Sequence, residues 1–305
     1  MKKTIQDKYP IPDWLNLFII VLCTIFFFFL LWFGSHTSNK WWLIPIGLAF
    51  GMIMVPVYSL MHEAEHGILN SNNKLNYFLG LHLGNLFMVS FTFLRHCHLN
   101  HHKHNRTDLE MWDLYYEHQN KFLKYGNLYL MMAGMGYIML PVSAILFTIY
   151  PPLVYSKIFT SHNEMSGFIQ GSDTRIKLMR IRLESIGAIL FQLLLFYLLK
   201  LDLLSWAIMY IIHGFIWSSQ NYVNHAFAPR DIINGAHNHT MTRFLKFIYL
   251  NFNVHLAHHQ NPQVPWLYLP VFIKKGPQRI SFLKAYIRLW KGPRMTHEPS
   301  PQPGK

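Results

Sequence analysis

The amino-acid sequence predicts an all-α integral membrane protein with about four transmembrane helices in two hairpins, further interfacial or re-entrant helices, and a histidine-rich cytoplasmic cap. Hydrophobic residues make up 51% of the 305 residues and charged residues 13%, whereas soluble domains carry about 25% charged residues. Four segments are apolar and long enough to cross a bilayer. Many of the 19 histidines cluster just beyond the ends of these segments.

The four expected spans are residues 14–33, 42–61, 185–199 and 203–219. Two other apolar stretches, 77–94 and 128–150, are ambiguous by the same criteria. Gly134, Gly136 and Pro141 weaken the second stretch as a straight helix.

Basic residues predict the topology, because cytoplasmic loops of membrane proteins carry an excess of lysine and arginine. Lys2, Lys3 and Lys8 place the N-terminus in the cytoplasm, so the first two spans form a hairpin with a short outer loop. A full span at 128–150 would place the following basic segment outside. The cations of that segment are Lys157, Arg175, Lys177, Arg180 and Arg182. We therefore expect 128–150 to re-enter the membrane or to lie in its interface.

The remaining features predict one domain and exclude some classes of function. We expect a single membrane domain over residues 1–305, with the histidine motifs at about 62–270 and a disordered tail at 295–305. Two cysteines exclude a disulfide framework. The net charge of +13 fits the positive-inside rule, and no nucleic-acid-binding motif accompanies it, so nucleic acid is not an expected partner.

The histidine motifs share helical spacing. Residues i, i+3 and i+4 of a helix lie on one face, so each motif directs its imidazoles to one place. The motifs are His62 with His66; His98 with His101 and His102; His255 with His258 and His259; and an N-x-x-x-H element, Asn221 with His225.

These nine histidines predict a metal centre. Imidazole binds iron, zinc, copper and nickel, and nine ligands are too many for one tetrahedral zinc. The set suits two metals with four or five nitrogen ligands each, near the membrane surface. Activation of a small oxidant beside a lipid is the chemistry that such a site favours.

The order and spacing of the motifs resemble the membrane-bound fatty acid desaturase-like superfamily of histidine-box diiron enzymes. The resemblance extends from about His62 to Pro270. It implies two iron ions and dioxygen as co-substrate, with Asn221 contacting one iron through water. The catalytic metal ligands it implies are His62, His66, His98, His101, His102, His225, His255, His258 and His259. It also implies a lipid or acyl substrate and a separate electron donor, ferredoxin-like or cytochrome b5-like.

The resemblance favours an acyl-chain desaturase that introduces a C=C bond. In this family the oxidant removes hydrogen from an unactivated carbon; loss of a second hydrogen gives the double bond, and oxygen transfer gives an alcohol. Residues 261–270 are similar to both bacterial acyl desaturases and carotenoid hydroxylases and ketolases. A carotenoid or lipid hydroxylase or ketolase therefore stays an alternative. We expect the histidines on the cytoplasmic side of a bacterial inner membrane.

Other polar residues receive secondary roles. Carboxylates that could orient the ligating rings are Glu63, Glu65, Asp108, Asp113 and Asp231. Arg95 or Arg106 could meet a substrate head group. Histidines expected to be packing or capping residues are His36, His82, His118, His162, His213 and His297. His96 and His104 are open between ligand, support and solvent, His237 and His239 are expected in a surface loop, and Cys97 is not expected to be a ligand.

Two rival functions come from other classes. His62-Glu63-Ala-Glu-His66 matches H-E-x-x-H, in which two histidines bind zinc and the glutamate is the general base. A membrane zinc protease would leave the two H-x-x-H-H motifs unexplained. A metal transporter would place its ligands near the middle of the bilayer, whereas these motifs lie just beyond span ends.

Overall fold

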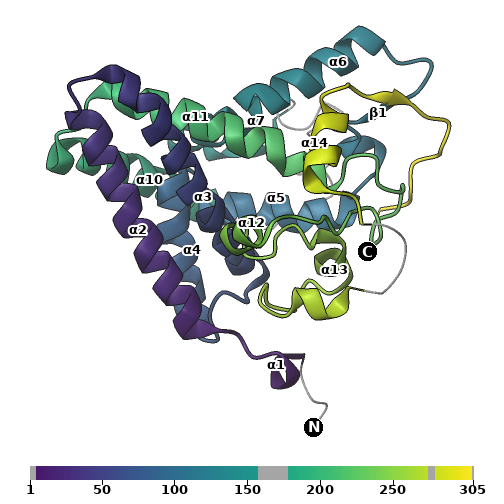
Figure 1. The fold of residues 1–305 in the computed structure, drawn as a ribbon, viewed down its shortest axis with the longest axis horizontal. Coiled ribbons are helices and arrows are strands. Elements are labelled where there is room, and N and C mark those ends of the chain that lie inside the picture. Colours follow the sequence, from purple (N-terminus) through teal and green to yellow (C-terminus); the bar gives the residue numbers. More distant parts are fainter. Residues whose placement is uncertain (1–4, 157–177, 274–278, 304–305) are drawn as a thin grey trace.

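The computed structural model describes residues 5–156, 178–273 and 279–303. Within these ranges the chain is mostly helical, with one two-stranded sheet. Figure 1 shows α2 along one edge of the molecule and α6, α14 and β1 at the opposite end. The helices are α1 Ile5–Lys8, α2 Asp13–His36, α3 Leu43–His66, α4 Asn73–Phe87, α5 Phe91–His104, α6 Lys121–Leu130, α7 Gly136–Ile149, α10 Leu178–Leu199, α11 Leu203–Asn221, α12 Arg243–Ile248, α13 His255–Gln260 and α14 Phe282–Leu289.

Four helical segments of the described chain are long and apolar enough to cross a membrane: Asp13–His36, Lys40–His66, Lys121–Ile149 and Leu178–Leu199. Three coincide with expected spans. The expected span at 203–219 forms helix α11, but α11 is not among the four. His213 and several hydroxyl and amide side chains lower its apolarity, and the segment around 128–150 takes its place in the set. Length and composition thus favour 121–149 over α11 as a span, and the expectation that 203–219 crosses the membrane stays a prediction.

The first hairpin and the turn after α10 meet at one end of the molecule. α2 packs along α3, and Phe27 and Phe50 are fully buried between them with ring centroids 5.4 Å apart. Between these helices lies the short 3₁₀ helix η1 (Lys40–Trp42). The Lys40 ammonium lies 3.1 Å from the carboxylate of Asp202, which caps α11. The two turns that the sequence places outside the membrane thus lie together.

The second pair, α10 and α11, is splayed. Gln192 of α10 contacts the indole of Trp206 and the hydroxyl of Tyr210 on α11. Beyond these contacts α11 packs mainly on α3, whereas α10 packs mainly on α7. The hairpin therefore opens away from its turn and leaves room for α7.

The stretch from Lys121 to Ile149 changes direction inside. α6 continues through a π-helical segment, η3 (Met131–Met135), into α7, and Gly134 adopts a φ of 125° there. The N–H of Tyr137 donates to Ser218 near the end of α11, and the Thr148 carbonyl accepts from Arg182 near the start of α10. The 200–202 turn joins the end of α10 to the start of α11. Ser218 and Arg182 lie near the opposite ends of these two helices, so both ends of α7 make contacts on the side away from that turn. The re-entrant course of this segment stays a prediction.

The other ambiguous stretch, 77–94, is broken. α4 and α5 meet at an angle of 97°. Met88 adopts a left-handed conformation that ends α4, and the Ser90 hydroxyl accepts the Phe93 N–H to begin α5. The sharp bend directs α5 toward the end of α3, where the second histidine motif meets the first.

The C-terminal segment packs against the cap. β1 (Leu114–Tyr115) pairs in parallel with β2 (Arg294–Met295). Further along, the Glu298 carbonyl accepts from Arg230, and the Ser300 hydroxyl accepts the Asp108 N–H. Residues of the expected disordered tail thus make specific contacts up to Ser300. Short 3₁₀ helices complete the cap: η2 Asp108–Glu110, η4 Pro151–Tyr155, η5 Tyr222–Asn224 and η6 Leu269–Phe272.

Candidate metal centre

The first motif lies on the last turn of α3. His62 and His66 are one helical turn apart and both are buried. Gly67 ends the helix in the left-handed region, φ 77°, and its N–H bonds back to the last turn. A glycine is favoured there because a Cβ is strained at this φ. The chain can therefore turn away directly after His66 and leave both imidazoles facing inward.

The second motif lies on α5 and meets the first. The Nε2 atoms of His66 and His98 are 2.7 Å apart, and those of His98 and His102 are 3.1 Å apart. The third residue of this motif, His101, points to the other side of the same helix end, where its Nε2 lies 3.2 Å from Nε2 of His225.

The remaining predicted ligands lie on α13 and directly after η5. His255, His258 and His259 are all buried on the short helix α13. Nε2 of His258 lies 3.1 Å from Nε2 of His102. The His225 ring stacks edge-on against those of His255 and His259 at 4.8 and 4.9 Å between centroids.

All nine predicted histidines therefore come together, and they divide into two adjacent groups. Within each group one nitrogen from every ring lies within 4.8 Å of all the others. The five-histidine group is His62, His66, His98, His102 and His258, and the four-histidine group is His101, His225, His255 and His259.

The donor set fits two metal ions. A metal–nitrogen bond of about 2.1 Å places neighbouring ligand nitrogens about 3 Å apart, and the close Nε2 pairs lie at 2.7–3.2 Å. Nε2 of His62 and Nε2 of His259 are buried and have no hydrogen-bond partner among the described residues. Burying a nitrogen without a hydrogen-bond partner costs free energy. A metal ion that binds imidazole would explain both the short distances between the Nε2 atoms and the missing hydrogen-bond partners.

Burial holds the imidazoles in the form that binds metals. Burial, and then the neighbouring imidazoles, lower the pKa of His255, His258 and His259 well below the usual range. The same causes lower the pKa of His225. Neutral imidazole has a free lone pair, so these side chains are in the form that can bind a metal ion at neutral pH.

Outer groups fix the orientation of several rings. Glu110 accepts a hydrogen bond from Nδ1 of His101, and the Gly235 carbonyl accepts from Nδ1 of His225 at 2.9 Å. Glu63 and Glu65 lie 3.9 and 3.8 Å from Nδ1 of His62 and His98, respectively. Because Nδ1 is engaged from outside, Nε2 of His101 and of His225 is left to face the centre.

Glu110 is the residue that the sequence analysis missed. It lies in η2, nine positions after His101, and no periodicity connects it with the motif. The available signal was only that an acidic residue follows the second motif in a short turn. Asp108 and Asp113, named from the same region, do not contact the histidines through any described ion pair or hydrogen bond.

Asp113 instead forms a buried ion pair with Arg106, with 2.6 Å between Oδ1 and Nη1. The Tyr222 hydroxyl and the Phe227 N–H also donate to this carboxylate. Burial alone would raise the pKa of Asp113, but Arg106 and these donors lower it below its usual value. Arg106 is 1% exposed, so the expectation that it meets a substrate head group is wrong.

The other proposed polar residues have structural partners. Asp108 pairs with Arg230 at 2.6 Å, and Asp231 accepts two backbone N–H groups in its own turn. The Arg95 guanidinium donates to the Glu65 carbonyl. The side chain of Asn221 hydrogen-bonds with Tyr58, one turn before His62; its water-mediated contact with iron stays a prediction.

Among the described residues, the histidines outside the motifs join neither group. His82 bonds Thr24, His36 bonds the Trp32 carbonyl, His118 stacks on Tyr116, and His213 is enclosed by aromatic rings. His297 is exposed, and His162 lies outside the described residues. His96 contacts Asn100, and His104 is buried. Cys97 is also outside both groups.

The expectation of a surface loop is wrong for His239, whereas His237 is half-buried in the same irregular segment. His239 is 2% exposed and both of its ring nitrogens contact backbone carbonyls, of Val223 and Ile280. Nε2 of His237 contacts the Ala226 carbonyl. Both side chains therefore hold the segment between His225 and α13 in place.

The family comparison agrees with this geometry. The family model described as fatty acid desaturase matches residues 39–272. The chain belongs to the fatty acid desaturase family. This range includes all nine histidines of the two groups. A search of curated proteins finds no match. The family implies an oxidoreductase with a lipid substrate, and the apolar helices agree with membrane association.

Within this desaturase-family chain, Glu63 is poorly placed for the zinc-protease alternative. One carboxylate oxygen accepts the Trp266 N–H at 2.9 Å, and the other lies on the Nδ1 side of His62. The unpartnered nitrogen of His62 is Nε2. Glu63 thus supports the ring from behind, whereas a general base must reach a metal-bound water.

Proposed function

We propose that this chain is an oxygen-dependent diiron desaturase that introduces a C=C bond into a lipid acyl chain. The observation that supports the proposal most is the convergence of nine buried or half-buried imidazoles into adjacent groups of five and four. Iron accepts imidazole ligands, and the family implies a lipid substrate. Two neighbouring all-histidine groups are more than a single hydrolytic zinc requires.

Each histidine group would hold one iron. When bound, the iron pair would supply the activation of dioxygen that removal of hydrogen from an unactivated carbon requires. The residues of the chain would hold the ligands and exclude water. Glu110 and the Gly235 carbonyl keep Nδ1 of His101 and His225 engaged.

An apolar wall closes one side of the centre. Leu250, Phe252 and Trp266 surround a cavity of about 10 Å³ beside His62 and His258, which is room for about one water molecule. Bulk water is thereby kept from the ligands on this side. A dry site protects a reactive centre from side reactions, as an oxidation of an unactivated carbon requires.

The electrons would come from a separate donor protein, ferredoxin-like or cytochrome b5-like. The net charge of +13 would favour association with an acidic donor. We also propose that the histidine groups lie on the cytoplasmic side, in a bacterial inner membrane, where such donors are available.

Lipid mass spectrometry of a host that expresses the chain tests the proposed reaction. The matched variants are His258→Ala, from the five-histidine group, and His118→Ala, an exposed histidine outside both groups. We expect an acyl species lighter by two hydrogens with the unaltered chain and with His118→Ala, and none with His258→Ala.

Other outcomes of the same experiment contradict the proposal in distinct ways. A lipid or carotenoid that gains oxygen would favour the hydroxylase or ketolase alternative. Zinc instead of iron in the purified chain, measured by elemental analysis, would overturn the diiron assignment. Equal products from His258→Ala and the unaltered chain would remove the histidine groups from the chemistry.

A further inference from the structure

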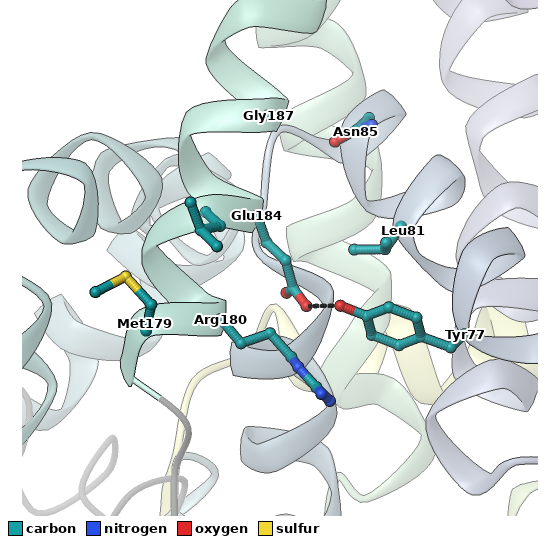
Figure 2. Close-up of a pocket in the computed structure, with 8 residues that line it drawn as sticks. Tyr77, Leu81, Asn85, Met179, Arg180, Glu184 and Gly187 are labelled. Carbon is teal, nitrogen blue, oxygen red and sulfur yellow. Dashed lines mark hydrogen bonds between the residues drawn. The ribbon is translucent and has the colours of Figure 1, made fainter. Parts of the chain in front are cut away.

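A groove that shares no residue with the two histidine groups lies between α4 and α10. Its volume is about 670 Å³, within the range of about 300–1,000 Å³ typical of small-molecule sites. Figure 2 shows Glu184 and Arg180 pointing from α10 toward Tyr77 of α4. The lining residues are Tyr77, Leu81, Asn85, Met179, Arg180, Leu183, Glu184 and Gly187.

The groove runs along two helices that lie side by side. Tyr77 of α4 contacts Glu184 of α10, and the Asn85 carbonyl, two turns further on, accepts from Gln192. From Arg180 to Gly187 the groove follows α10 for about 10 Å. The flanking side chains of Met179 and Leu183 are exposed, and α10 is one of the candidate spans. The groove therefore opens toward lipid chains.

One end of the groove is cationic. The Arg180 guanidinium is exposed and lies 5.1 Å from the centre of the Tyr77 ring. The nearby carboxylate of Glu184 accepts four hydrogen bonds, from Tyr77, Ser90 and twice from Thr92, at 2.6–2.7 Å. No ion pair joins Arg180 to a carboxylate among the described residues. Its charge is thus available to an anion at the end of the span.

The other end of the groove is open and mildly polar. A Cβ added at Gly187 would meet no atom within 4 Å, so this space is open among the residues that the structure describes. Asn85 presents its side-chain amide to the same groove (Figure 2). The cation at the membrane surface matches the phosphate of a phospholipid. The apolar groove matches its acyl chain, and the amide within the groove matches an ester carbonyl. Basic pockets between membrane helices bind such head groups.

We propose that the groove between α4 and α10 is a phospholipid-binding site, separate from the metal centre, with the phosphate at Arg180 and an acyl chain along Leu81, Leu183 and Gly187. The lipid would join α4 to α10. Glu184 of α10 also holds Ser90 and Thr92 at the start of α5, which presents the second histidine motif. Bound lipid would thereby stabilise the helix that supports three of the metal ligands.

The test measures binding of phosphatidylglycerol to the delipidated full-length protein in detergent, with phospholipid per protein quantified by mass spectrometry. Gly187→Leu fills the groove, and Arg180→Gln removes its cation. Gly126→Leu is the matched control, because a Cβ at Gly126 of α6 also meets no atom within 4 Å. We expect Gly187→Leu to lose the lipid and Arg180→Gln to bind it about fivefold more weakly, while Gly126→Leu binds like the unaltered chain.

Equal binding by Arg180→Gln and the unaltered protein would overturn the phosphate position, and this exposed variant does not depend on the packing of the core. Equal loss in all three variants, or equal retention in all three, would mean an adventitious lipid only. Iron content of each variant is measured in parallel. Because lipid binding is read without turnover, its failure would leave the proposed desaturation untouched, and the reverse also holds.

Discussion

The orientation of single imidazole rings decides whether nine histidines can act as ligands. A ring whose Nδ1 is held from outside presents Nε2 inward, and such outer contacts fix the tautomer as well as the angle. Glu110 does this for His101, and the Gly235 carbonyl does it for His225. The four-histidine group therefore depends on residues that are not part of any histidine motif.

Glu110→Gln is expected to weaken metal binding at the four-histidine group by about 10- to 100-fold, because the amide cannot accept from His101 as the carboxylate does. Iron retained after dialysis against a chelator, measured by elemental analysis, checks this. Glu117→Gln is the matched control, since Glu117 is exposed and seven residues further along. Iron retention in Glu110→Gln equal to that of Glu117→Gln would contradict the assigned role.

The buried histidines also predict an acid limit for the metal-free protein. Burial and neighbouring rings lower the pKa of His255, His258 and His259 well below the ordinary value of 6.5. The unfolded chain then binds more protons than the folded one below about pH 6.5, so stability falls as the pH falls. Each histidine contributes about 1.4 kcal/mol per pH unit in this window.

Thermal unfolding of the metal-stripped chain between about pH 8 and about pH 5 measures this effect. We expect a midpoint that is nearly constant above about pH 7 and declines below it. Metal-stripped His258→Ala, with one titrating group fewer, is expected to show a shallower decline. A midpoint independent of pH over the acid half of the range would be inconsistent with buried neutral imidazoles.

At the level of helices, short connecting segments set the direction and position of the long helices. The bend between α4 and α5 brings His98 to His66. Trp266, in the segment before η6, donates its N–H to Glu63 and its indole N–H to Asn16. In this chain Trp266 therefore joins α2 and α3 behind the His62 ring.

Gly134 offers a test of one such connection. Its φ of 125° lies where side chains other than glycine are strained, and it allows η3 to join α6 to α7. Gly134→Ala is expected to destabilise the protein by about 1–3 kcal/mol, measured as a lower midpoint of thermal unfolding. Gly126→Ala, in open space on α6, is expected to be neutral or stabilising by up to about 1 kcal/mol. Equal midpoints for the two variants would refute the strain.

Across the whole molecule, the turns and the histidines lie at opposite ends of α3. The 20 residues from Leu43 to His62 span about 29 Å of helix, close to the bilayer core of about 30 Å. Lys40 and Asp202 join the two turns at the far end. The arrangement predicts that one surface of the membrane faces the turns and the other faces the metal centre.

Cysteine labelling in intact cells tests which surface is which. We expect an impermeant thiol reagent to label Ser38→Cys, at the exposed turn before η1, without permeabilisation. Glu117→Cys, exposed in the cap, should react only after the membrane is opened. The positive-inside bias of the basic residues is the physical reason. Labelling of Glu117→Cys alone in intact cells would reverse the proposed sidedness.

The sequence by itself determined the helical class, three of the four candidate spans and all nine grouped histidines. It could do so because span length and the i, i+3, i+4 spacing are local properties of a helix. It left α11 and the 121–149 stretch open, because both are near the apolarity that a span requires and apolarity alone does not show which of them crosses the membrane.

Only the tertiary structure decided how the nine imidazoles divide into groups of five and four, because members of each group come from three separate parts of the chain. It also revealed Glu110 as the partner of His101, the burial of Arg106 and His239, and the groove between α4 and α10. These features depend on contacts between residues distant in sequence or on the angle at which helices cross. No periodicity records such contacts, so the chain must fold before they are defined.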